Sequence, residues 1–145
     1  MRGHRAKLAQ LRAGLGTGAG TVHAMDRIVD LDAAAAEIEQ RRPDWLANSL
    51  QPGPTTWRES AGEWPYAIVP DRGEVRAPDS VGVFVKAQHR GEMEIVLFRG
   101  GWADVSIAVY DDERAPHLDT PEIRTPEAFD IALDEAIAEL RRRLP

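Results

Sequence analysis

The sequence predicts an α+β fold in which an antiparallel β-sheet of four to six strands packs against an N-terminal and a C-terminal helix. Residues 81–110 contain three short runs rich in β-branched and aromatic residues, separated by glycine-containing breaks. This pattern is typical of an antiparallel meander. Segments before and after it, residues 32–50 and 125–145, carry apolar residues at helical spacing. The composition, 43% hydrophobic and 29% charged, is that of a globular protein.

Residues 1–24 are predicted to be a flexible leader, basic and rich in glycine, and residues 25–145 a single α+β domain. The leader spells Gly14-Leu-Gly-Thr-Gly-Ala19, which imitates a dinucleotide-binding fingerprint. That fingerprint needs a preceding strand and a following helix, so that the pyrophosphate meets a helix N-terminus. A basic, helix-like segment precedes it here, and we therefore expect no nucleotide site.

The first helix is expected to start with Asp32 as its N-cap, followed by four alanines of high helix propensity. Pro43 lacks an amide hydrogen and clashes with the preceding turn in a helix interior. We therefore expect the helix to end near Arg41 and Pro43 to open a second short turn. The neighbouring charged residues are expected to form a solvated face, and they are Glu37, Glu39, Arg41 and Arg42.

The register of the meander is predicted from the lengths of its two breaks. A four-residue loop over residues 88–91 sets Val83 opposite Val96, and a two-residue turn over 100–101 sets Val96 opposite Val105. The face packed against the helices then holds Val81, Val83, Val85, Val96, Phe98, Val105, Ile107 and Val109. The second face holds Phe84, Lys86, Met93, Ile95, Leu97, Trp102, Asp104, Ser106 and Tyr110.

Two interpretations of the second face remain open. Its aromatic residues and few charges are typical of a protein-binding patch. Alternatively, residues 55–70 cover this face with Trp57 and Trp64. Short strands are expected within that segment, at 55–60 and 66–69, and a loop or edge strand at 115–124.

The C-terminal helix has the clearest pattern. Thr125 is an N-cap, Pro126 takes the first helical position, and Arg141-Arg-Arg143 complements the helix dipole, so the arginines need no nucleic acid to explain them. One face is apolar and comprises Phe129, Leu133, Ala136, Ile137, Leu140 and Leu144.

Residues suited to catalysis or metal binding are scattered. The four histidines lack ligand spacing, there is no cysteine, and neither a P-loop nor a nucleophile elbow is present. We therefore predict no catalytic residue, no metal ligand and no cofactor, and no enzymatic activity. Without a spanning apolar run or a signal peptide, no membrane partner is expected, and the lack of cysteine fits the cytoplasm.

Charge is divided unevenly along the chain. Residues 1–25, which end at Met25, contain four basic side chains and no acidic one; the basic residues are Arg2, Arg5, Lys7 and Arg12. Because the net charge of the whole chain is −6, the remaining residues carry a net charge of −10. Such a domain is poorly suited to binding nucleic acid, and a basic protein is the expected kind of partner. Solubility alone is the alternative explanation.

The order of segments resembles the small immunity proteins of bacterial polymorphic toxin systems, most closely the TriTu-type family. The resemblance is carried by the Arg-Arg-Pro-Asp-Trp45 segment, the strand Ile95-Val-Leu-Phe98 and the following Arg99-Gly-Gly-Trp-Ala-Asp-Val-Ser106, with the Thr125-Pro-Glu helix closing the chain. It implies a cytoplasmic protein that binds a cognate toxin domain and occludes its active site or substrate cleft. The expected contacts are Trp102, Asp104, Tyr110, Asp111, Asp112 and Glu113. The alternative function is a small-molecule-binding or catalytic α+β domain of unknown chemistry.

Overall fold

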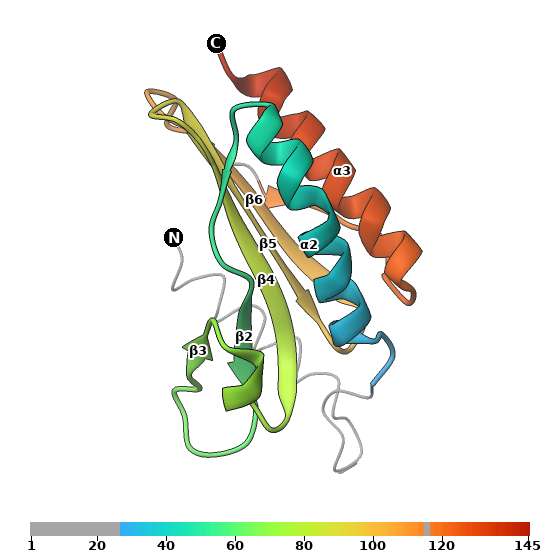
Figure 1. The fold of residues 1–145 in the computed structure, drawn as a ribbon. Helices are drawn as coiled ribbons and strands as arrows, with labels where there is room; N and C mark the ends of the chain where they lie inside the picture. Colours follow the sequence, from blue (N-terminus) through green and yellow to red (C-terminus); the bar gives the residue numbers. More distant parts are fainter. Residues whose placement is uncertain (1–26, 115–116) are drawn as a thin grey trace.

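Two helices cover one face of an antiparallel sheet in the computed structural model, which describes residues 27–114 and 117–145 (Figure 1). The elements in chain order are α2 (Leu31–Ala47), β1 (Gln51–Pro52), β2 (Thr56–Glu59), β3 (Ile68–Val69), the 3-10 turn η1 (Arg72–Glu74), β4 (Pro78–Ala87), β5 (Gly91–Phe98), β6 (Trp102–Val109), β7 (His117–Leu118) and α3 (Pro126–Arg143). The predicted α+β class is therefore confirmed. The predicted leader, residues 1–24, lies outside the described residues.

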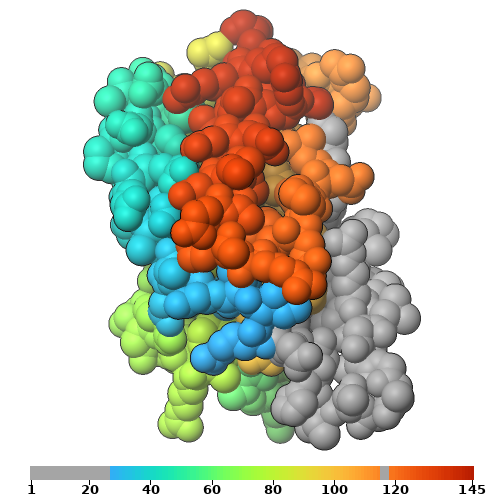
Figure 2. Space-filling model, turned by 90° about the vertical axis from the view of Figure 1, so that its right-hand side faces the viewer, coloured from blue at the N-terminus to red at the C-terminus, as the bar shows by residue number. Residues whose placement is uncertain are grey.

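The sheet runs in the order β3-β2-β4-β5-β6-β7, with β1 also paired to β4, and every pairing is antiparallel. The long strands β4, β5 and β6 form the predicted meander. Helices α2 and α3 lie side by side along it (Figure 2). Neither of these helices is long and apolar enough to cross a membrane.

Helix α2 differs from its prediction at both ends. Its N-cap is Asp30, whose carboxylate accepts a hydrogen bond of 3.1 Å from the amide of Ala33, and Asp32 lies in the first turn. The helix also continues through Pro43 to Ala47 instead of ending near Arg41. An interior proline costs about 3 kcal/mol, and the burial of Trp45 one half-turn later offsets much of that cost.

Arg41 and Arg42 are structural, which corrects the expected solvated face. Arg41 donates to Asp134 and to Asp130, each at 2.9 Å, and so joins α2 to α3. Arg42 donates to the carbonyl of Gly53 at 2.6 Å, which ties α2 to the segment after β1. These contacts hold the helix at the two residues that precede Pro43.

The register of β5 is shifted by one residue at each turn relative to the prediction. Val83 lies opposite Ile95 rather than Val96, and Ile95 lies opposite Val105. Both loops contain three residues, 88–90 and 99–101, because Ala87 pairs with Gly91 and Phe98 with Trp102. Gly101 closes the second loop with a φ of 93°, a conformation that glycine adopts without steric cost.

Alternate residues of β5 therefore exchange faces. Met93, Ile95 and Leu97 are fully buried beneath the helices, whereas Val96 and Phe98 lie on the other side. The contribution of β4 and β6 to the core is as predicted, because Val81, Val83, Val85, Val105, Ile107 and Val109 are all buried. From α3, the core receives Phe129, Ala132, Leu133, Ala136, Ile137 and Leu140.

Truncation of Leu133 tests this packing. Leu133 is fully buried on α3, so Leu133→Ala should lower the free energy of unfolding by about 2–5 kcal/mol in a urea titration. Ile131, on the same helix but 59% exposed, supplies the control, and Ile131→Ala should change it by less than about 0.5 kcal/mol. Equal effects of the two substitutions would remove α3 from the core.

Candidate functional site

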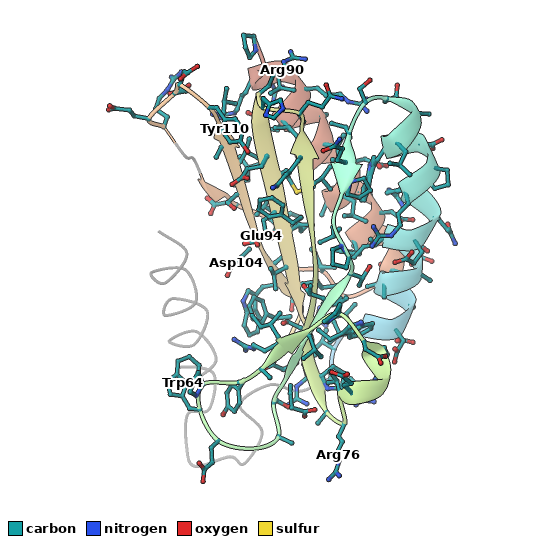
Figure 3. The ribbon with its side chains drawn as sticks, turned by 60° about the vertical axis from the view of Figure 1, so that its left-hand side comes forward. Trp64, Arg76, Arg90, Glu94, Asp104 and Tyr110 are labelled. Carbon is teal, nitrogen blue, oxygen red and sulfur yellow. The ribbon has the colours of Figure 1, made fainter. Side chains whose placement is uncertain are left out.

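The candidate site is the outer face, the side of β4, β5 and β6 turned away from the helices (Figure 3). Its side chains are Phe84, Lys86, Glu92, Glu94, Val96, Phe98, Trp102, Asp104, Ser106 and Ala108. Glu92 and Glu94 were missed in the prediction, which placed Met93, Ile95 and Leu97 here. The alternation of Glu92 and Glu94 with apolar Met93 and Ile95 was the signal that could have found them.

The part of the outer face nearer Tyr110 is polar. Lys86 lies opposite Glu92, and Glu94 lies opposite Ser106. Tyr110, just beyond the end of β6, donates from its hydroxyl to the Glu92 carboxylate at 3.2 Å. Desolvation, together with the charge of Glu92, raises the pKa of the Tyr110 phenol above its ordinary value of 10.0. The phenol therefore stays protonated and able to donate.

The opposite part of the outer face, where β5 ends and β6 begins, is aromatic. Phe98 and Trp102, directly opposite each other on β5 and β6, stack with ring centroids 5.0 Å apart and planes 14° apart. The Arg58 guanidinium lies 5.2 Å from the Phe98 ring centroid, at cation–π distance. The indole Nε1 of Trp102 is buried and finds no hydrogen-bond acceptor in the part of the chain that the structure describes. Stacking thus fixes the Trp102 ring, which remains half-buried.

Arg58 is itself held by a buried ion pair with Asp79. Its Nε and Nη2 donate to the two carboxylate oxygens at 2.7 and 2.6 Å. Only 11% of the Arg58 side chain and 5% of the Asp79 side chain are exposed. This bidentate pair joins β2 to β4 and sets the position of the cation over Phe98.

The segment over residues 55–70 covers one corner of the outer face, which settles part of the alternative interpretation. Trp57 belongs to the core, opposite Val81. Trp64 is 59% exposed and meets Tyr66 edge-to-face at 5.7 Å. The Tyr66 ring in turn lies 5.9 Å from the Arg58 guanidinium. The two tryptophans therefore do not cover the rows that contain Glu94 and Asp104.

The acidic turn follows directly after β6. Asp111 has a positive φ of 71°, Asp112 pairs with Arg114 at 3.0 Å, and Glu113 is exposed. The side-chain hydrogen bond from Arg114 lowers the pKa of the Asp112 carboxyl below its ordinary value of 3.8. Asp112 is therefore ionised throughout the physiological range.

The six predicted contact residues do not form one cluster, because two lie on β6 and four lie beyond its end. Trp102 and Asp104 lie on the outer face, and Tyr110 and the acidic turn follow the far end of β6. Figure 3 shows Asp104 in the middle of the face and Tyr110 at that end. Eight residues of strand separate Trp102 from Tyr110 by about 26 Å. A standard interface covers about 800 Å² per partner, so a single partner can reach both ends.

The described part of the chain offers few groups suited to metal binding or catalysis. No group of three or more His, Cys, Asp or Glu residues there is arranged to hold a metal ion. A cavity of about 470 Å³ at the start of α2 is lined by arginines and by Asp30 and Asp32. Arginine does not titrate near neutral pH, and both aspartates are hydrogen-bonded, so the cavity suits binding better than proton transfer.

Comparison of the chain with protein-family models, with curated proteins and with solved structures finds no match. The functional case therefore depends on the geometry and charge of the outer face.

Removal of one member of the Arg58–Asp79 pair should strongly destabilise the fold. Asp79→Ala leaves the buried guanidinium without its partner, so the free energy of unfolding should fall by about 3–5 kcal/mol in a urea titration. Asp112→Ala breaks an ion pair whose arginine is 81% exposed and screened by solvent, so it should lower the free energy of unfolding only slightly. A loss of the same small size for Asp79→Ala would show that the pair is solvated.

Neutralising Arg114 should shift the titration of Asp112. The Asp112 pKa is depressed by its hydrogen bonds with Arg114, so Arg114→Gln should raise it towards 3.8. Because the folded-state pKa is depressed, the stability from this contact is present above the unfolded-state pKa and is lost as the pH falls through the folded-state value. A carboxyl-carbon NMR titration measures the shift, and an unchanged midpoint would contradict the contact.

Proposed function

We propose that this chain is an immunity protein that binds a cognate toxin domain and occludes its active site or substrate cleft. The outer face is the observation that carries the proposal. It combines three carboxylates, from Glu92, Glu94 and Asp104, with a stacked aromatic pair at one end and a tyrosine at the other. The order of segments, which resembles that of TriTu-type immunity proteins, points to the same function.

Carboxylates on a flat strand surface suit a basic partner. Toxins that act on nucleic acids need basic clefts, and a row of carboxylates can occupy such a cleft in place of phosphates. The chain carries a net charge of −6, so its long-range field also favours encounter with a basic domain. Nucleic acids and anionic membrane surfaces are disfavoured as partners by the same charge.

The aromatic pair is suited to anchor the complex. Trp102 is held against Phe98 before any partner arrives, so little side-chain entropy is lost when the ring becomes fully buried. Tryptophan and tyrosine are enriched among residues that dominate binding energy. We therefore assign the anchor to Trp102, with Tyr110 at the other end and Asp111, Asp112 and Glu113 at the rim.

The proposal places the protein in the bacterial cytoplasm and makes its partner identifiable. The partner is sought in the C-terminal domain of a large secreted protein encoded directly upstream. Co-expression with this chain should restore growth to cells that produce the domain, and the two purified proteins should form a complex. If the upstream domain is toxic and neither protection nor a complex is observed, the proposal is wrong.

Truncation of the anchor should weaken the complex through its dissociation rate. Loss of a buried aromatic anchor costs about 2 kcal/mol or more, so Trp102→Ala should increase the dissociation rate roughly thirtyfold in a surface-plasmon-resonance measurement. Leu46→Ala, at a 61% exposed position of α2, is the matched control and should bind like the parent. Circular dichroism checks that both variants fold. A folded Trp102→Ala variant with parental kinetics would exclude this anchor.

Neutralising the acidic turn should act on association instead. The combined change Asp111→Asn, Asp112→Asn and Glu113→Gln should slow association at low salt and have little effect at high salt. A variant that carries Asp44→Asn, Glu74→Gln and Glu135→Gln removes the same charge from exposed positions on α2, η1 and α3. Equal slowing by both triple variants would indicate a net-charge effect and remove the turn from the rim.

A further inference from the structure

We propose that the cavity at the start of α2 binds the phosphoryl group of a small molecule. This site goes beyond the proposed function, because it is distinct from the outer face. The cavity has a volume of about 470 Å³, within the range of small-molecule sites. It receives arginines from three separate segments: Arg27 before α2, Arg72 and Arg76 around η1, and Arg99 from the loop between β5 and β6.

Charge in this cavity is positive although the chain as a whole is acidic. Arg72 is already bound by Asp32, with Nε and Nη2 at 2.8 and 3.3 Å from the carboxylate oxygens, and it also lies over the Trp57 ring. The Asp30 carboxylate accepts from the helix amide of Ala33. Among described residues no carboxylate pairs with Arg27, Arg76 or Arg99. Arg27, Arg76 and Arg99 thus line the cavity without a direct ion pair to a described carboxylate. Glu59 accepts instead from the backbone amide of Arg76 at 2.7 Å, and its charge offsets part of that of Arg76.

Arg99 supplies the most specific observation. Its Nε is buried and has no hydrogen-bond acceptor among residues 27–114 and 117–145. Its backbone is fixed, because its amide donates to the Asp79 carbonyl at 2.9 Å and its own carbonyl accepts from Ile28 and Val29 at 2.9 and 3.3 Å. A buried donor without an acceptor is costly, and rotation of the Arg99 side chain towards an anion in the cavity would satisfy it.

The number of cations favours a phosphoryl group over a carboxylate. A carboxylate carries one charge and matches a single guanidinium fork, whereas a phosphoryl group carries nearly two charges on three acceptor oxygens. Guanidinium groups are well matched to that geometry. The N-terminus of α2 is already capped by Asp30 and carries Asp32 in its first turn, so the arginines rather than the helix dipole supply the attraction for an anion.

The test is a titration of the full-length protein, by isothermal calorimetry and by amide NMR shifts, with inorganic phosphate, a nucleoside monophosphate and acetate. The two phosphorylated compounds distinguish a free phosphate from a phosphoryl group on an organic molecule. We expect saturable binding of at least one of them, amide shifts centred on residues 27–32, 72–76 and 99, and no saturation with acetate.

Substitution of single arginines should weaken this binding about tenfold, which is the typical effect of losing one charge-assisted hydrogen bond. Arg76→Gln and Arg99→Gln are the test variants, and exposed Arg76 is the one whose loss leaves the fold intact. Arg90→Gln is the matched control, since Arg90 lies at the opposite end of the molecule (Figure 3).

Three outcomes would overturn the proposal. They are the absence of saturable binding at millimolar concentrations of both phosphorylated compounds, amide shifts centred elsewhere, and equal weakening by Arg76→Gln and Arg90→Gln. If Arg99→Gln fails to fold, the result for Arg76→Gln decides alone.

Discussion

The lengths of two tight turns determine which side chains of β5 face the helices. With three residues in each of the loops 88–90 and 99–101, Ile95 aligns with Val83 on one side and Val105 on the other. Side chains alternate along a strand, so one residue more or less in either loop would exchange the two faces of β5. The core needs Met93, Ile95 and Leu97 beneath α2 and α3, and the outer face needs Glu92 and Glu94 on the other side. Both helix packing and the candidate interface therefore depend on this register.

Much of the fold was predictable because its signals are local. The caps and apolar face of α3, the three long strands and the break at each turn all lie within a few residues of the chain. The face of β5 was predicted wrongly, because each turn was given the wrong length. The two errors cancel across β6, so Trp102 and Asp104 are on the outer face as predicted, although the intervening strand was reversed.

Features that depend on contacts distant in sequence were not predictable. Arg41 pairs with Asp130 and Asp134, which lie 89 and 93 residues further along the chain, and neither partner is marked by any local pattern. The same holds for the Arg58–Asp79 pair and for the four arginines that converge on one cavity. In each case a guanidinium links two elements, and the hydrophobic pattern that identifies elements carries no information about such links. The tolerance of Pro43 within α2 also depends on tertiary packing, because the burial of Trp45 offsets its cost.

The composition of the outer face depends on the register of β5. Cross-strand NOEs of the isotopically labelled protein test that register most directly. Backbone NOEs should join Met93 with Ile107, Ile95 with Val105 and Leu97 with Ala103. NOEs that instead join Val96 with Val105 and Leu97 with Asp104 would contradict the structure. They would bury Glu94 against the helices and return Ile95 to the opposite face.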